Sequence, residues 1–143
     1  MRMRMPASLC VSAVLLAAAP AASAQSLPIN CKAPKCVVTV IVAGNSCAGG
    51  IHVSKDPIVL PLGQQVDIEW NIPQEVEWDF DGIQGIVLYQ ATQSTLAPVK
   101  DALAPKRYVI RLGATKTAAT YKYDINLKRG GASCKLDPVI MTN

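Results

Sequence analysis

The chain has 143 residues, half of them hydrophobic, and its 14 Lys and Arg exceed its 10 Asp and Glu by a formal charge of only +4. A chain of this size forms one domain that buries most of its apolar surface without a metal or a partner. The weak charge balance and the lack of interleaved basic and aromatic residues exclude nucleic acid as a predicted partner.

The first 24 residues have the pattern of a secretory signal peptide. Arg2 and Arg4 precede an apolar run, and Ala22-Ser23-Ala24 follows it as a cleavage site. The run is shorter than the roughly 20 residues that span a bilayer. We therefore expect residues 1–24 to be removed, which leaves a short segment over 25–35 and one domain over 36–143. The mature protein is predicted to be periplasmic or secreted, without membrane insertion.

Four cysteines remain after the predicted cleavage: Cys31, Cys36, Cys47 and Cys134. An even number in an exported domain indicates two disulfides, with three possible pairings. If 36–42 is a strand, Cys36 and Cys47 lie toward opposite ends of a rod roughly 20 Å long, whereas disulfide Cα atoms lie within about 7 Å. We prefer the pairs Cys31–Cys36 and Cys47–Cys134. A zinc-type cluster is the alternative, but no Cys-x-x-Cys partner follows and the chain has one His.

Short strand-like runs separated by turn signals predict an all-β chain, a two-sheet Greek-key sandwich with two disulfides. The turn signals include Pro61-Leu62-Gly63 and Asp81-Gly82, and Gly85 is a possible bulge. Residues 91–106 are expected to form a long surface connection with at most one helical turn. The strands are predicted, in chain order, within 36–42, 51–60 as two pieces broken at Asp56-Pro57, 65–71, 75–80, 83–89, 107–112, 119–127 and 136–141.

Alternation assigns faces to several of these runs. The run 36–42 is continuously apolar, as in a strand covered on both faces. In 65–71, alternation places Val66, Ile68 and Trp70 inward and the acids between them outward. The run 75–80 repeats the pattern with Trp78 and Phe80, so we interpret these aromatic residues as core and not as a ligand platform.

The order of pieces resembles the cupredoxin-like sandwich: an apolar first strand, a Pro and Gly turn before "QVDIEW", a variable middle connection, then "TYKYDINL" and a last strand "DPVIM". It is similar in particular to small exported cupredoxin-like proteins of unknown function. The resemblance covers roughly residues 36–143 and implies a cupredoxin-like or immunoglobulin-like fold.

Copper-binding members of that fold have a Cys and then a His after an aromatic-x-aromatic pair. Here Tyr121-x-Tyr123 leads instead to Ile125 and Lys128 at the matching positions, and His52 is the sole His. A type 1 copper site needs two imidazoles and a thiolate, so the resemblance implies a protein without that site. We predict no cofactor and no resident metal.

Catalysis is not predicted either. No Gly-x-Ser-x-Gly elbow is present, and a single His without a placed acid does not make a triad. Paired carboxylates for glycoside hydrolysis need a cleft with acids on facing elements, which one exposed strand face does not supply. We therefore predict that the protein is not an enzyme.

Charge segregation is the strongest lead to function. Seven acids and no Lys or Arg lie between Asp56 and Val99, whereas residues 100–135 contain nine Lys and Arg and two acids. One interpretation is cross-strand neutralisation, with the acids opposite Arg107, Arg111 and Lys122. The functional interpretation makes 65–71 and 75–80 hairpin neighbours whose carboxylates form one cation-binding face. The candidate binding residues are Asp67, Glu69, Glu75, Glu77, Asp79 and Asp81.

The sequence thus supports an exported, disulfide-stabilised, non-catalytic binding or structural module that contacts a basic protein or a cationic surface through the acidic strand face. The alternative is a metal-handling protein that uses carboxylates and His52. Calcium ranks lower than a protein partner, because calcium sites take oxygens from loops that curl round the ion and a flat strand face does this poorly.

Overall fold

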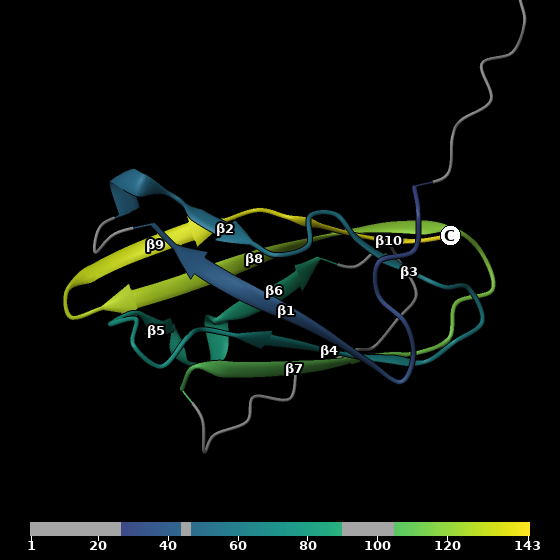
Figure 1. Ribbon diagram of the computed structural model, residues 1–143, viewed down its shortest axis with the longest axis horizontal. Helices are drawn as coiled ribbons and strands as arrows, with labels where there is room; N and C mark the ends of the chain where they lie inside the picture. The colour runs from purple at the N-terminus through teal and green to yellow at the C-terminus, as the bar shows by residue number, and fades with distance from the viewer. Residues whose placement is uncertain (1–26, 44–46, 90–104) are drawn as a thin grey trace, which may run out of the picture.

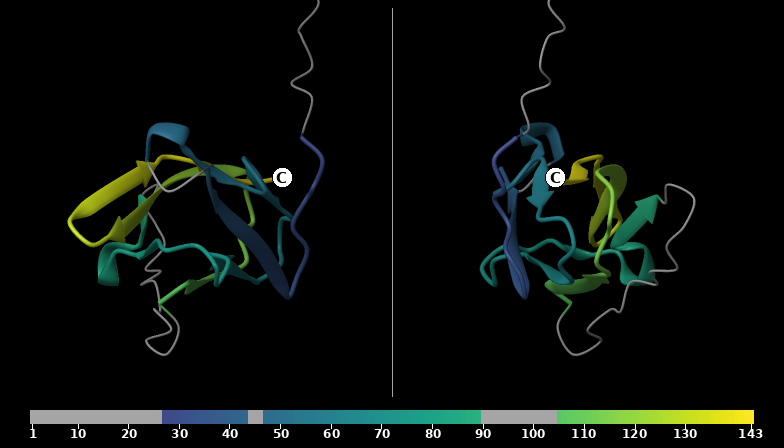
Figure 2. Two further views of the ribbon diagram at one scale, coloured as in Figure 1. Left: turned by 60° about the vertical axis from the view of Figure 1, so that its left-hand side comes forward. Right: turned by 90° about the vertical axis from the view of Figure 1, so that its right-hand side faces the viewer.

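The computed structural model describes residues 27–43, 47–89 and 105–143. The predicted signal peptide, its cleavage site and almost all of the predicted 91–106 connection lie outside the described residues. The described strands form two layers that face each other (Figures 1 and 2). The prediction of an all-β, two-sheet sandwich is therefore confirmed.

The first sheet has four strands in the order β2-β1-β4-β7. Strands β1 and β4 run parallel, and the other two pairs are antiparallel. These strands are β1 (Lys35–Val42), β2 (Ile51–Val53), β4 (Val66–Asn71) and β7 (Arg107–Leu112), and a short 3-10 helix η1 (Cys47–Gly49) precedes β2.

The second sheet is organised around the long strand β8, which pairs with β10, β9, β6 and β5. Strand β3 extends this sheet by pairing in parallel with β10. The strands are β3 (Ile58–Leu60), β5 (Asp79–Phe80), β6 (Ile86–Tyr89), β8 (Ala119–Arg129), β9 (Ala132–Leu136) and β10 (Val139–Thr142), and the 3-10 helix η2 (Gly82–Gln84) lies between β5 and β6.

Alternating apolar residues from both sheets form the core, as the sequence pattern predicts. Trp70, Trp78 and Phe80 are all buried, which confirms their interpretation as core residues. Trp70 of β4 packs on Tyr123 of β8 with ring centroids 5.3 Å apart, and its indole N–H donates to the Tyr123 hydroxyl at 3.3 Å. This contact joins the two sheets near the middle of the sandwich, where burial raises the pKa of Tyr123.

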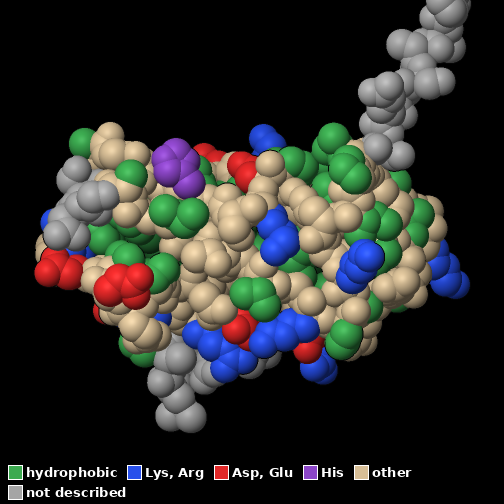
Figure 3. Space-filling view, in the orientation of Figure 1, with side chains coloured by type: hydrophobic (Ala, Val, Ile, Leu, Met, Phe, Trp, Pro, Cys, Tyr) green, Lys and Arg blue, Asp and Glu red, His purple; other side chains and the backbone are tan. Residues whose placement is uncertain are grey.

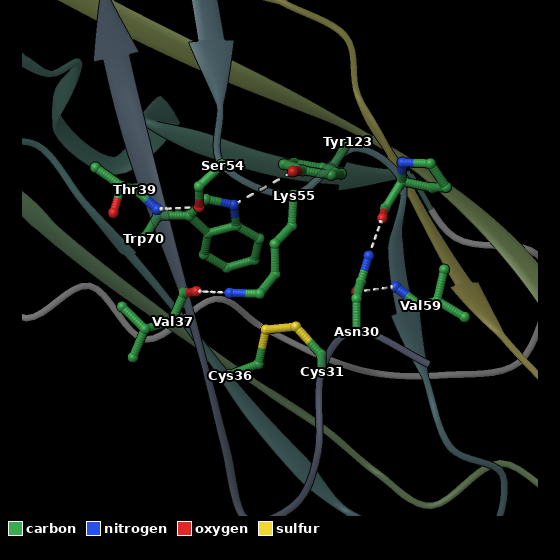
Figure 4. The surroundings of a disulfide bond; sticks show 11 residues. Asn30, Cys31, Cys36, Val37, Thr39, Ser54, Lys55, Val59, Trp70 and Tyr123 are labelled. Atoms are coloured by element: carbon green, nitrogen blue, oxygen red, sulfur yellow. Dashed lines mark hydrogen bonds between the residues drawn. A yellow bond between two sulfur atoms is a disulfide. The ribbon is translucent and has the colours of Figure 1, made fainter. Parts of the chain in front are cut away.

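The two disulfides have the predicted pairing, Cys31–Cys36 and Cys47–Cys134. The short-range disulfide, Cys31–Cys36, ties the segment before β1 to β1 itself (Figure 4). The long-range disulfide, Cys47–Cys134, joins η1 to β9 and therefore links the two sheets at one end of the sandwich.

Residues 27–31 run beside β3 at the edge of the second sheet. The backbone N–H groups of Asn30 and Cys31 donate to the Val59 carbonyl, and the Asn30 side chain accepts from the Val59 N–H (Figure 4). Asn143 donates from its side chain to the Leu27 carbonyl at 2.9 Å. Because an uncovered strand edge can pair with another chain, this segment protects the edge of β3.

Three details differ from the sequence-based expectations. Strand β1 is not covered on both faces, because Val37 and Ile41 are exposed on its outer side. Gly85 is not a strand bulge but ends η2 in a right-handed helical conformation. Strand β9 was not expected, because its sequence "ASCKL" has only a weak apolar alternation and is specified by its pairing with β8.

Among the described residues, no helix has the length and the apolar character that crossing a membrane requires.

Candidate acidic contact surface

The six candidate acids do not form one face. Asp67 and Glu69 lie on β4 in the first sheet, whereas Asp79 begins β5 in the second. The expectation that 65–71 and 75–80 are hairpin neighbours is therefore wrong, because Ile72 and the residues after it carry the chain from one sheet to the other. We call Asp67 and Glu69 the inner acidic pair, and Glu75, Glu77, Asp79 and Asp81 the outer acidic group.

The inner acidic pair is neutralised by cations on both neighbouring strands. Arg111 lies opposite Asp67 in the β4–β7 register and binds its carboxylate with two N–H groups at 2.7 and 3.1 Å. Glu69 accepts from Lys35 of β1 at 2.6 Å and from Arg107 of β7 at 2.9 Å. Two of the three predicted cross-strand cations, Arg107 and Arg111, therefore pair with these acids.

The inner acidic pair is strongly held in its charged form. Burial alone would raise the pKa of Glu69, but hydrogen bonds from Lys35, Asn71 and Arg107 outweigh it and lower that pKa to about 2. The hydrogen bonds from Arg111 likewise lower the pKa of Asp67. Both carboxylates are therefore ionised at neutral pH and already have cationic partners.

Residues 74–77 form a turn and a bend where a strand was predicted from residue 75, and only Asp79 and Phe80 pair as β5. The Val76 N–H donates to the Pro73 carbonyl at 3.1 Å, which closes the turn. Lys106 then holds the segment: its ammonium donates to the carbonyls of Val76 and Trp78 and forms an ion pair with Asp79 at 3.1 Å. A single cation located 28 residues after Trp78 thus replaces strand pairing here.

A second cation lies under Glu77. The Arg129 guanidinium stacks over the buried Trp78 ring at 5.1 Å from its centroid and donates to Glu77 at 3.4 Å. Asp81 makes a third ion pair, with Lys128 at 3.4 Å. Among the described residues Glu75 has no ion pair, and its side chain is exposed.

The two sets of acids differ in which partner faces the solvent. In the inner pair the cation is outermost: the Glu69 side chain is 9% exposed, against 50% for Lys35. In two ion pairs of the outer group the order is reversed: Asp79 is 42% exposed over a Lys106 that is 14% exposed, and Glu77 is 66% exposed over an Arg129 that is 31% exposed. In the third pair, Asp81 and Lys128 are exposed to similar extents, 47% and 51%. A partner that approaches Glu77 or Asp79 therefore meets carboxylate oxygens first.

The space-filling view agrees with this division. Acidic side chains show at the end of the molecule where Figure 1 places β5, while basic side chains dominate the lower margin along β7 with acids between them (Figure 3). The inner acidic pair thus lies within a mixed-charge surface of the first sheet, and the outer acidic group lies at one end of the sandwich.

His52 lies on β2, where it is exposed beside Ile41 of β1 (Figure 3). Within the described parts of the chain, no group of three or more His, Cys, Asp and Glu residues could hold a metal ion. Ile125 is buried in the core, and Lys128 is the partner of Asp81. The two positions that the resemblance matched to copper ligands are thus a core residue and an ion-pair residue.

Sequence reasoning assigned no role to Asp124. This carboxylate points outward from β8 but is buried, because the Tyr89 hydroxyl from β6 and Lys135 from β9 both donate to it. Burial alone would raise the pKa of Asp124, but these hydrogen bonds outweigh it and lower that pKa below its ordinary value. Only the strand register, which the sequence does not give, brings Tyr89 and Lys135 to the same carboxylate.

Comparisons with known proteins place the chain in no family. No protein-family model matches it, and no curated protein matches it. A solved structure of the cysteine protease inhibitor EhICP2 from Entamoeba histolytica is similar at 10% identity and a TM-score of 0.33, over 80% of this chain and 97% of that one. At that TM-score the similarity supports no inference about function.

Proposed function

We propose that the protein is an exported, non-catalytic binding module whose outer acidic group contacts a basic protein or a cationic surface. The observation that carries the proposal is the order of exposure in the ion pairs: Asp79 and Glu77 lie outside the cations that hold them. Carboxylates held in this way are fixed in position and still available to a partner. Rim charges of this kind steer association and set specificity more than they set affinity.

The fold supports a surface contact better than a small-molecule site. Two disulfides and two hydrogen-bonded sheets make a rigid frame. A pocket between the ends of β3, β7, β8 and β10, lined by Leu60, Leu112, Tyr121 and Thr142, has room for about one water molecule. Ligand sites for drug-sized molecules are far larger.

Export and the resemblance to cupredoxin-like proteins belong to the same proposal. The disulfides are of the kind that persist in oxidising compartments, which supports a periplasmic or secreted location. The pieces that carry the resemblance are strands here: β1, β4 after the turn at Leu62-Gly63, β8 and the final β10.

The test uses a peptide in which Lys alternates with Ser as a basic probe, with binding measured by fluorescence anisotropy at two salt concentrations. The variant Glu75→Gln, Glu77→Gln, Asp81→Asn removes three exposed charges and leaves Asp79 in place for Lys106. Three lost contacts of roughly 0.5 kcal/mol each correspond to about tenfold weaker binding.

The matched control Asp56→Asn, Asp67→Asn, Asp137→Asn removes the same charge elsewhere on the surface. It is expected to bind the probe as the unmodified protein does. Equal weakening in both triple variants would show that only net charge matters, and it would refute the assignment of the contact to the outer acidic group.

A further inference from the structure

The turn between β5 and β6, residues 81–85, carries an exposed apolar side chain at the same end of the sandwich. Ile83 is 78% exposed, more than any other exposed large hydrophobic residue in the described part of the chain. It lies in η2, two residues after Asp81 of the outer acidic group. No folding contribution is expected from a side chain that remains in water to this extent.

The backbone of this turn is held from several sides. Asn126 of β8 donates from its side chain to the Gln84 carbonyl at 2.7 Å and from its backbone to the Gly85 carbonyl at 2.8 Å. It also accepts from the Asp81 N–H at 2.9 Å. The buried Tyr108 donates its hydroxyl to the carbonyl of Ile83 itself at 3.1 Å.

Gly85 seats the turn directly on the core. A Cβ at this position would lie 2.7 Å from the Phe80 Cβ and 3.2 Å from the Tyr108 ring, so only glycine allows the backbone to approach this closely. The turn is therefore rigid, and its apolar tip is presented in one position. A contact made by a rigid tip costs little conformational entropy on binding.

We propose that Ile83 is the apolar anchor of the binding surface and that the partner presents apolar side chains flanked by Lys or Arg. This inference rests on the proposed function, because the outward carboxylates of Glu77 and Asp79, together with the exposed Asp81, supply the charge complementarity that specifies a basic partner. Interfaces of this kind have an apolar centre with a charged rim.

Two basic peptides of equal charge test the inference: one in which Lys alternates with Ser and one in which Lys alternates with Leu. The unmodified protein should bind the Leu peptide about tenfold more tightly, as expected for burying one large aliphatic side chain. Ile83→Ser should remove this preference and leave binding of the Ser peptide unchanged. Ile83→Leu should retain the preference.

Ile41→Ser is the matched control, because Ile41 is also exposed but lies on β1 in the other sheet. It should keep the preference for the Leu peptide. If Ile83→Ser keeps it too, Ile83 is not the anchor, although the acidic contact stands. If neither peptide binds the unmodified protein, the proposed function itself is wrong. Circular dichroism melts of both serine variants confirm that each is folded.

Discussion

The buried carboxylate of Glu69 makes a quantitative prediction about stability in acid. Its pKa is about 2 in the folded protein and 4.5 as the ordinary value. The unfolded chain therefore binds more protons between these values, so stability is lost as pH falls through this range. Glu69→Gln removes the titrating group and should remove this part of the pH dependence.

The pKa difference corresponds to about 3.4 kcal/mol at 1.36 kcal/mol per pKa unit. The cationic partners are well hydrated, since Lys35 is 50% exposed and Arg107 is 41% exposed. Solvent screening of such pairs reduces the expected contribution to roughly 2 kcal/mol. Because the unfolded chain takes up its proton first as the pH falls, more than half of this stability is lost above about pH 3, where unfolding can be measured.

The assay is urea unfolding of the unmodified protein and of Glu69→Gln at several pH values from 6 to 3. The difference in unfolding free energy between them should shrink by about 1 kcal/mol over this range. Glu75→Gln, which changes an exposed carboxylate without an ion pair among the described residues, should follow the unmodified protein. A difference for Glu69→Gln that stays constant with pH would refute the argument that its ion pairs stabilise the fold.

Three further changes have expected outcomes. Replacing both cysteines of the long-range disulfide by Ser should lower the free energy of unfolding by about 4.6 kcal/mol, and the same change in the short-range disulfide by about 2 kcal/mol. The difference arises because the two disulfides close loops with sequence separations of 87 and 5. Denaturant melts under oxidising conditions measure both values. Lys106→Met should lower the free energy of unfolding by roughly 2–3 kcal/mol, because two carbonyls and Asp79 lose a largely buried donor. Lys128→Met, which changes an exposed residue, should lower it by less than about 1 kcal/mol. Gly85→Ala should destabilise by about 1–3 kcal/mol through overpacking, whereas Gly113→Ala, with nothing near its Cβ position, should change stability by under about 0.5 kcal/mol in the same melts.

Local pattern was sufficient where strands carry a strict alternation. Val66, Ile68 and Trp70 are buried on β4, as their spacing predicts. The length of one strand argued against a Cys36–Cys47 disulfide, and the pairing preferred among those that remained is the observed one. In each case the information lies within a few residues of the position concerned, or in a distance that one extended strand fixes.

Prediction failed where a distant residue decides the local structure. The alternation of residues 75–80 is as regular as that of β4, yet Lys106 binds the carbonyls there and only Asp79 and Phe80 become strand. The division of the acids has the same origin. Whether the carboxylate or its cation is the more exposed partner depends on the strand register and on how deeply each side chain is buried. The distribution of charges along the sequence gives information on neither.

The parallel pairing of β3 with β10 has a consequence for the order of folding. Ile58 is in register with Ile140, so this pairing joins two segments that are far apart in the sequence. Residues 27–31 then close the other side of β3. Folds dominated by such distant contacts form slowly, in roughly milliseconds to seconds. During synthesis, β3 therefore lacks its partner in the second sheet until β10 has also been made.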